Sequence, residues 1–251
     1  MQLPADMAAG GELPRHIAII MDGNRRWAQR HGKPPLAGHR AGVENVRMAV
    51  RLCSDLGVGY LTCYAFSTEN WKRSATEVQG LWRLLIEFLA SDLPELMARG
   101  VRLRVIGDRA GLPLFVRQAV NSAETATTRG RRLSLLLALN YGSRQEIAGA
   151  ARALCREVAE GRLRPEDVDE HALETHLSTA GIPDPDLVIR TSGEQRLSNF
   201  LLWQVAYSEL WVTPACWPDF TRDDFLAALD DYGKRHRRFG GSDAQRSGPP
   251  G

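Results

Sequence analysis

The chain has 251 residues, of which 43% are hydrophobic and 25% charged, a balance typical of a globular protein with a buried core. Its formal net charge is only +2, so no global positive field recruits nucleic acid, and any basic site must be local. No apolar run approaches the ~20 residues of a membrane span, and the N-terminal segment lacks the pattern of a signal peptide. We therefore expect a cytoplasmic protein that does not bind nucleic acid.

Apolar patterning predicts strands that alternate with helices along most of the chain. The expected strands, in chain order, are 16–21, 60–66, 101–107, 133–140, 186–190 and 208–213. The expected helices are 42–56, 77–99, 112–128, 143–160, 169–180 and 221–238. This alternation favours an α/β fold, a single domain with a mostly parallel central sheet of about six strands flanked by helices. One folded domain over 14–241 is expected between disordered tails at 1–13 and 242–251.

Polar clusters follow three of these strands. They are DGNRRW (22–27), STENWKR (67–73) and RTSGEQRLSN (190–199). The carboxyl ends of parallel strands meet at one edge of the sheet, and ligands of such sheets gather there. Three clusters at this edge predict a binding site.

The residue types in these clusters favour a phosphorylated substrate. No GxxxxGK[ST] motif is present, and no GxGxxG opens a helix, so ATP and dinucleotide sites lose support. Forked guanidinium donors suited to phosphate oxygens are supplied by Arg26, Arg73, Arg190 and Arg196. Asp22 and Glu209 carry carboxylates suited to Mg²⁺, which prefers one or two carboxylates plus substrate phosphates. A Mg²⁺-assisted reaction of a phosphorylated substrate is expected, without a choice among such reactions.

Six motifs occur together, in the order and spacing of one known family. They are HIAIIMDGNRRWA, GHRAG, YAFSTENWKR, LNYGSR, DLVIRTSGEQRLSNFLLWQVAYSELWVT, and WPDF with RRFGG. With them the chain resembles the cis-prenyltransferases, the isoprenyl or undecaprenyl-type diphosphate synthases, from about His16 to Gly241. The resemblance implies an enzyme that condenses isopentenyl diphosphate with an allylic prenyl diphosphate to give a longer Z-polyprenyl diphosphate.

The resemblance also implies Mg²⁺ as cofactor, a homodimer, and at most peripheral membrane contact through the product. A hydrophobic tunnel is implied for the growing chain, with 81–93 and 133–139 as apolar walls. One alternative is a non-catalytic partner subunit of a heteromeric prenyltransferase. Such relatives usually lose the catalytic aspartate, whereas this chain retains it as Asp22. A short-chain Z-prenyl diphosphate synthase is the other alternative, and a medium or long product is favoured here.

Residue roles follow from the same resemblance. Asp22 matches the aspartate that holds Mg²⁺, Glu209 matches a second acidic position at the metal, and Asn24 with Ser67 matches groups that assist proton removal. The residues expected at the allylic diphosphate are Gly23, Asn24, Arg25, Arg26, Trp27 and His39, although Trp27 by itself suggests packing. Those of the isopentenyl diphosphate clamp are Arg190, Arg196 and Ser198. A mobile loop contributes Ser67, Glu69, Trp71 and Arg73, and a C-terminal arm that reaches the partner subunit contributes Arg238 and Gly240.

Four positions depart from the family pattern. Many members have glycine, arginine, proline and histidine where this chain has Arg25, Pro35, Ser74 and Gln195. Our hypothesis is that Arg25 replaces the phosphate donor that Pro35 removes, and the alternative is that Arg25 points to solvent. Short-chain members block the tunnel with a bulky residue where this chain has Ala65, which leaves Trp82 as a candidate constriction.

Overall fold

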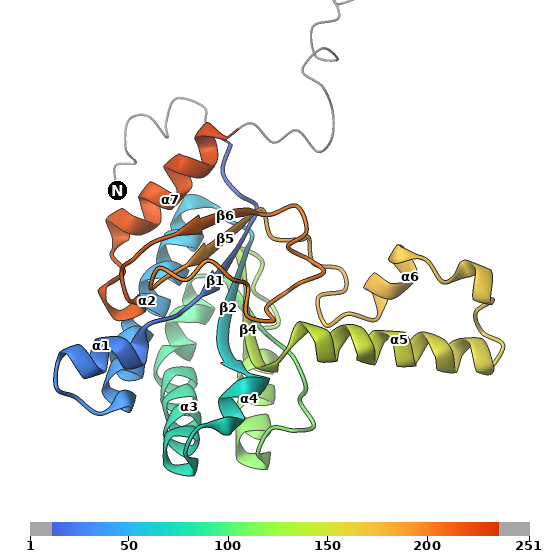
Figure 1. Cartoon of the computed structure of the whole chain (residues 1–251), viewed down its shortest axis with the longest axis horizontal. Helices are drawn as coiled ribbons and strands as arrows, with labels where there is room; N and C mark the ends of the chain where they lie inside the picture. The colour runs from blue at the N-terminus through green and yellow to red at the C-terminus, as the bar shows by residue number, and fades with distance from the viewer. Residues whose placement is uncertain (1–11, 236–251) are drawn as a thin grey trace, which may run out of the picture.

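A six-stranded sheet forms the centre of the protein. The computed structural model describes residues 12–235 (Figure 1). All strands run parallel, in the order β3–β4–β2–β1–β5–β6. Their bounds are β1 His16–Ile20, β2 Tyr60–Ser67, β3 Val101–Ile106, β4 Leu133–Tyr141, β5 Leu187–Arg190 and β6 Glu209–Val212. The predicted α/β class and parallel sheet are confirmed. Arg238, Gly240 and the predicted tail 242–251 lie outside the described residues, as does most of the predicted tail 1–13.

Helices follow most strands, with some bounds that differ from the prediction. They are α1 Asn24–Arg30, α2 Pro35–Leu56, α3 Ala75–Ala98, α4 Leu114–Ala126, α5 Ser143–Ala159, α6 Glu170–Thr175 and α7 Arg222–Lys234. Short 3₁₀ turns cover η2 Thr68–Lys72, η3 Pro165–Asp167 and η4 Trp217–Asp219. Helix α1 was not predicted, α2 begins seven residues earlier than expected, and α6 is shorter. Within residues 12–235 no helix is both long and apolar enough to cross a membrane.

The two faces of the sheet bury alternate residues of each strand. Ile17 and Ile19 of β1 face the main core, which α2, α3, α4 and α7 complete. Ala18 and Ile20 face a second, smaller core that is covered by Phe200 and its neighbours in the segment before β6. Helix α5 contributes few buried residues and projects from the body of the molecule (Figure 1).

The crossovers place a crevice beside β1. From β1 the chain moves to β2 through α2 on one face, whereas from β5 it moves the other way to β6 across the opposite face. Right-handed crossovers in opposite directions must use opposite faces of a sheet. The loops after β1 and β5 therefore diverge at the carboxyl edge, which is where parallel sheets hold ligands.

Two glycines allow α1 to lie directly on α2. A Cβ at Gly38 would stand 1.9 Å from the carbonyl oxygen of Asn24, and one at Gly42 would stand 2.5 Å from Asn24 Oδ1. These glycines interrupt the apolar periodicity, which is why the helix was predicted to begin only at 42. Pro34 and Pro35 start it instead, because proline is compatible with the first helical turn.

His16 connects β1 to its surroundings from inside the core. Its Nδ1 lies 2.7 Å from the carbonyl oxygen of Pro183 and its Nε2 lies 2.8 Å from Thr62 Oγ1. A carbonyl can only accept, so Nδ1 carries the proton and Nε2 accepts from the hydroxyl. Burial lowers the pKa of His16 to about 4, against the opposing effects of the Pro183 hydrogen bond and the charge of Asp186.

Substituting Gly38 tests the close approach of α1 to α2. Gly38→Ala should lower the free energy of unfolding by about 1–3 kcal/mol because the Asn24 carbonyl blocks the new methyl group. Gly149→Ala is the matched control, since its Cβ would meet nothing closer than 3.9 Å within α5. The control should be neutral or stabilising by up to about 1 kcal/mol. Equal denaturant midpoints for the two variants would contradict the packing described here.

His16 should also make stability depend on pH. Its folded pKa of about 4 lies below the ordinary value of 6.5, so the unfolded chain takes up a proton that the folded chain does not. Stability from this residue is complete above pH 6.5 and is lost as the pH falls towards 4, by up to about 3 kcal/mol. The stability difference between wild type and His16→Gln, measured by denaturant titration from pH 7.5 to 4.5, should shrink accordingly. A difference that does not vary with pH would rule this out.

Candidate functional site

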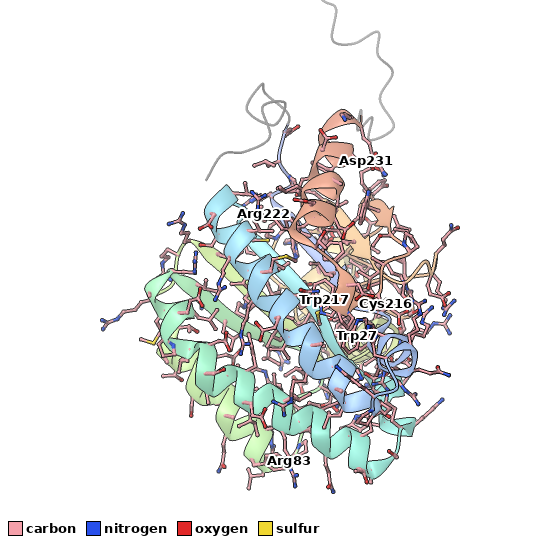
Figure 2. All side chains as sticks on the ribbon, turned by 90° about the vertical axis from the view of Figure 1, so that its left-hand side faces the viewer. Trp27, Arg83, Cys216, Trp217, Arg222 and Asp231 are labelled. Carbon is pink, nitrogen blue, oxygen red and sulfur yellow. The ribbon has the colours of Figure 1, made fainter. Side chains whose placement is uncertain are left out.

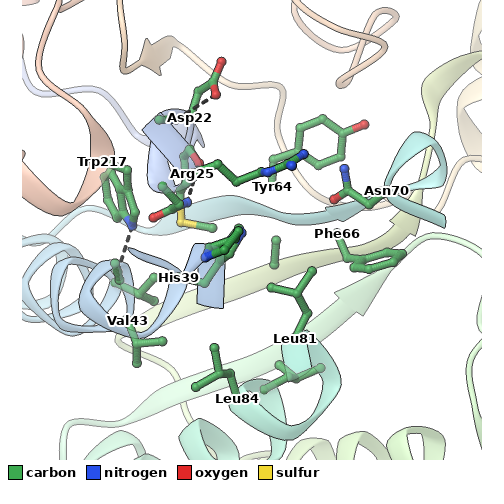
Figure 3. Close-up of a pocket in the computed structure, with 18 of the residues that line it drawn as sticks. Asp22, Arg25, His39, Val43, Tyr64, Phe66, Asn70, Leu81, Leu84 and Trp217 are labelled. Atoms are coloured by element: carbon green, nitrogen blue, oxygen red, sulfur yellow. Dashed lines mark hydrogen bonds between the residues drawn. The ribbon is translucent and has the colours of Figure 1, made fainter. Parts of the chain in front are cut away.

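A cavity of about 720 Å³ opens at the carboxyl edge of the sheet. Figure 3 shows its division: Asp22, Arg25 and His39 lie at one end, whereas Val43, Leu81 and Leu84 lie at the other. The walls come from α1, α2, α3 and the strands β2 and β4. A polar mouth thus leads into an apolar interior.

The carboxylate of Asp22 is fixed by the loops after β1 and β5. Its Oδ2 accepts from Arg190 Nη2 at 3.0 Å and lies 3.2 Å from Arg26 Nη2. Its Oδ1 accepts the Gly23 amide at 2.7 Å. Burial alone would raise the pKa of Asp22, but the hydrogen bonds from Arg190 and Gly23 and the charges of both arginines outweigh it. The pKa is lowered, and the group is ionised at neutral pH.

Arg190 is the buried cation of the site, with only 3% of its side chain exposed. Besides Asp22 it binds Ser198 Oγ at 2.9 Å and the carbonyl oxygen of Arg196. Ser198 adopts a left-handed backbone with φ 50°, which turns the segment after β5 back towards Arg190. The Nε atom of Arg190 is buried and has no hydrogen-bond partner among the described residues. Of the three residues predicted for the isopentenyl diphosphate clamp, Arg190 contacts Asp22 and Ser198 contacts Arg190, whereas the guanidinium of Arg196 pairs with Glu194.

The first turn of α1 carries the next group. Gly23 caps the helix with φ 98°, and a Cβ there would meet Ser192 Oγ at 2.8 Å, so only glycine fits. Arg26 donates to the carbonyl oxygen of Ser192 at 3.1 Å, which ties α1 to β5. Asn24 donates to the carbonyl oxygen of Met21 at 3.1 Å, and its buried Oδ1 has no partner among the described residues. That oxygen is an acceptor in the wall of the cavity.

Two arginines and a histidine surround Glu77 at the other side of the mouth. Its Oε1 lies 3.1 Å from Arg73 Nη1, 3.7 Å from His39 Nε2 and 3.8 Å from Arg25 Nε. Arg25 is 59% exposed in its side chain yet lines the cavity. Its side chain therefore reaches both the solvent and the mouth.

His39 is neutral in this setting. Burial, followed by the charges of Arg73 and Arg25, lowers its pKa to about 4. Because Arg73 Nη1 donates to Nε2 at 3.3 Å, the ring proton stays on Nδ1. His39 can then offer one N–H to an anion without carrying charge itself.

The loop after β2 contacts the end of β4 and the segment between β5 and β6. Trp71 donates to Asn140 Oδ1 at 2.7 Å and packs on Phe66 and Trp82. Glu69 accepts from Asn199 at 3.1 Å. The Ser67 amide donates to Asn70 Oδ1 at 3.1 Å. Trp71 and Glu69 do not line the cavity, so this loop borders the mouth.

Two predicted residues lie apart from this group. Trp27 donates to Asp219 Oδ1 at 2.6 Å and stacks on His31, on the side of α1 that faces η4 (Figure 2). Glu209 begins β6 and pairs with Arg235 at 2.6 Å. Since Val212 is the β6 residue level with Arg190, Glu209 lies about 10 Å back along the strand. The expected pairing of Asp22 with Glu209 around one metal ion is therefore not formed within this chain.

Asp22 nevertheless suits a Mg²⁺ ion that shares its ligands with a substrate. It is ionised and partly exposed at the cavity mouth. Mg²⁺ needs one or two carboxylates when phosphate oxygens and water fill its other positions. Residues 12–235 contain no cluster of three or more His, Cys, Asp or Glu side chains around one point.

Sequence reasoning missed Glu77 and Thr191. Glu77 resembles an ordinary acid in the first turn of a helix, and its amide is capped by Ser74. Thr191, fully buried after β5, accepts the Asp22 amide at 2.9 Å and lies 2.7 Å from the Asp22 carbonyl oxygen. Its position beside Arg190 in a polar cluster was the available signal, whereas nothing in the local sequence of Glu77 marked it.

The family model described as "Putative undecaprenyl diphosphate synthase" matches residues 20–240. Among curated proteins, an isoprenyl transferase of Heliobacterium mobile is 54% identical over 91% of this chain and 88% of its own length. An isoprenyl transferase of Agrobacterium fabrum is 52% identical over 91% of this chain and 92% of its own length.

Solved structures give the same picture. Lavandulyl diphosphate synthase from Lavandula x intermedia, crystallised with dimethylallyl diphosphate, superposes with a TM-score of 0.89 at 42% identity, covering 91% of this chain and 98% of that one. A "probable undecaprenyl diphosphate synthase" from Campylobacter jejuni gives a TM-score of 0.76 at 33% identity, covering 92% and 100%.

Proposed function

The chain belongs to the undecaprenyl diphosphate synthase family of prenyltransferases, and we propose that it condenses isopentenyl diphosphate with an allylic prenyl diphosphate to give a Z-polyprenyl diphosphate of medium to long chain. The observation that carries this proposal is the division of the cavity into a cationic mouth and an apolar interior. A prenyl diphosphate has the same division between a charged head and a hydrocarbon tail. Apolar walls favour the tail because burying it removes apolar surface from water.

The mouth offers two groups of phosphate donors on either side of Asp22. On the α1 side, Arg26, Arg25 and the Nδ1–H of His39 surround the position that we assign to the allylic diphosphate, with Arg73 behind them. On the β5 side we assign isopentenyl diphosphate to Arg190 and Ser198, which lie in contact, and to Arg196, whose guanidinium would exchange Glu194 for the phosphate. Guanidinium groups suit both because their forked donors match phosphate oxygens.

Asp22 is the residue that would hold Mg²⁺ on a substrate diphosphate. When bound, the ion supplies Lewis-acid stabilisation of the negative charge that develops on the leaving diphosphate. Arg26 and Arg73 act on the same charge, and they favour the transition state because they are in place before it forms. The unpartnered Oδ1 of Asn24 is suited to accept a hydrogen bond near the reacting carbons, and we assign proton removal to the surroundings of Asn24 and Ser67.

We also propose a cytoplasmic homodimer in which Arg238 and Gly240 of one chain complete the site of the other. Family membership and the position of Glu209 support this. Glu209 lies away from Asp22 within one chain, so a shared metal position would need a rearrangement or a second chain. A short-chain product is the alternative, since one structural relative is a lavandulyl diphosphate synthase.

Product analysis with Asp22→Ala tests the activity and the metal together. Purified wild type should convert labelled isopentenyl diphosphate and an allylic primer into longer prenyl diphosphates in the presence of Mg²⁺, and a chelator should stop it. Asp22→Ala should lower kcat by about 10³-fold or more, since several kcal/mol of transition-state stabilisation are lost. Asp223→Ala is the control, because that carboxylate is 92% exposed in its side chain and distant from the mouth. Full activity of Asp22→Ala would disprove the metal assignment.

Arg25→Gly tests whether this arginine replaces the donor that is missing at Pro35. Loss of one charge-assisted hydrogen bond, about 1.5–3 kcal/mol, should weaken use of the allylic primer by about tenfold or more. The KM for isopentenyl diphosphate should change little, and adding Pro35→Arg should recover part of the loss. Steady-state kinetics with each substrate varied in turn measure both effects. Allylic kinetics that do not respond to Arg25→Gly would show that Arg25 does not replace the missing donor.

A further inference from the structure

Three loops at the carboxyl edge of the sheet converge on the side-chain amide of Asn199. Its Nδ2 donates to Glu69 Oε1, after β2, and to Gln145 Oε1, after β4, both at 3.1 Å. Its Oδ1 accepts the backbone amide of Arg144 at 2.8 Å. Because a backbone amide can only donate, this contact fixes which end of the side chain carries the oxygen. Asn199 therefore ties the loops after β2 and β4 to its own segment after β5.

The backbone around Asn199 is held in one conformation as well. Its carbonyl oxygen accepts the amide of Ser143 at 2.8 Å. Ser198, Asn199 and Leu201 all have positive φ angles, of 50°, 62° and 47°. Residues other than glycine adopt this left-handed region at a cost, which persists only where the surrounding contacts impose it, and such segments gather at functional sites. The segment after β5 is therefore a tight turn whose shape depends on its contacts.

Two adjacent side chains of this turn reach different parts of the site. Ser198 Oγ lies 2.9 Å from Arg190 Nη1, within the group that we assign to isopentenyl diphosphate. Asn199, the next residue, contacts Glu69 in the loop after β2. One peptide unit thus joins a side chain of the isopentenyl side to the contact that fixes this loop.

The 3₁₀ turn η2 connects this contact with the allylic side of the mouth. Glu69 is the second residue of η2, and Arg73 follows its last residue, four positions or about 8 Å further along. Arg73 lies 3.1 Å from Glu77 Oε1, in the group that faces the allylic position. Between the two ends, Asn70 lines the cavity (Figure 3). A shift of η2 at Glu69 would therefore also move Arg73.

The junction between η2 and Asn199 is closely packed. A Cβ at Gly142, where β4 leads into α5, would stand 2.8 Å from Asn199 Nδ2, 2.7 Å from Thr68 Oγ1 and 2.4 Å from Gln145 Oε1. Only glycine leaves room for these three groups at the same point. The start of η2 is therefore seated against the end of β4 and the turn after β5 together.

Glu69 is the charged acceptor at this junction. Burial acts to raise the pKa of Glu69, but hydrogen bonds from its own amide and from Asn199 hold that pKa below its usual range. The carboxylate is therefore ionised at neutral pH and can only accept. An amide that faces it with its nitrogen suits this position, whereas a second carboxylate would repel it.

We propose that Asn199 is a positioning residue, which fastens η2 to the turn that carries Ser198 and thereby places Arg73 for the allylic diphosphate. This inference rests on the proposed function, because it assigns a further residue to the same two diphosphate positions. Asn199 lines no part of the cavity and acts through Glu69 and η2.

An exchange of donor and acceptor tests the link in the protein without substrates. Asn199→Asp keeps an acceptor for the Arg144 amide and tolerates a left-handed backbone, but it sets two carboxylates against each other. Amide hydrogen exchange of residues 68–73, followed by mass spectrometry, should become about two- to tenfold faster. Adding Glu69→Gln restores a hydrogen bond with donor and acceptor reversed, and exchange should return towards that of the wild type.

Steady-state kinetics test whether the link positions the allylic donor. Asn199→Asp should raise the KM for the allylic primer by about two- to tenfold, the range for one hydrogen bond. The KM for isopentenyl diphosphate should change little, because the new carboxylate keeps the Arg144 contact that holds the turn at Ser198. The double variant with Glu69→Gln should recover most of the loss.

Two further variants complete the comparison. Asn121→Asp makes the same chemical change on the exposed face of α4, away from the cavity, and should alter neither exchange nor kinetics. Glu69→Ala removes the link from its other end. It should speed exchange of 68–73 and raise the allylic KM in the same way, and it serves where Asn199→Asp does not fold.

The outcomes separate this inference from the function on which it rests. If the wild type makes no prenyl diphosphate from any allylic primer, the proposed function fails. If the wild type is active and Asn199→Asp changes neither exchange nor the allylic KM, the function stands and this inference is overturned. Faster exchange with an unchanged allylic KM would also overturn it, since Asn199 would then only order the loop. An equal rise of both KM values that Glu69→Gln does not reverse would show a structural role alone.

Discussion

The contact between Asp22 and Arg190 is the constraint on which the site depends. It joins the loops after β1 and β5 at the point where the two crossovers diverge. Removing one partner of such a pair leaves the other buried and uncompensated, which costs more than the pair itself contributes. Arg190 is also held by Ser198 and by the Arg196 carbonyl, so its orientation is fixed before any ligand arrives. One carboxylate thus positions the donors of the β5 side and remains accessible from the mouth.

Helix α1 reaches its position at the site because glycines lie where it contacts its neighbours. Gly23, Gly38 and Gly42 allow the first turn of α1 to contact the loop after β5, α2 and Trp217 at distances that a Cβ would prevent. As a result the amide of Asn24 is held against α2 with one hydrogen bond to Met21 and an unused acceptor. Backbone proximity, and not a network of side chains, brings this residue to the cavity wall.

Local patterns predicted the parts of the fold that local physics determines. Buried strands and long amphipathic helices were recognised because each carries its own periodicity, and the clusters at strand ends indicated the edge of the site. Helix α1 and the first turns of α2 were missed because glycines selected for close contact remove the apolar signal there. Glu77 and the separation of Glu209 from Asp22 depend on register between distant segments, which no local pattern contains. The resemblance assigned roles to single residues but could not say which of them meet within one chain.

Helix α3 passes through three environments: a charged mouth, an apolar cavity and a second charged region. Its first turn holds Glu77 among the cations of the mouth, its middle presents Leu81 to Phe88 to the cavity, and its last turns hold Asp92 and Glu95 against arginines of α2. Ionisable groups at both ends of the cavity, together with the exposed Arg40–Glu87 ion pair, hold α2 against α3. The middle of α3 is therefore supported by contacts beyond the cavity as well as at its mouth.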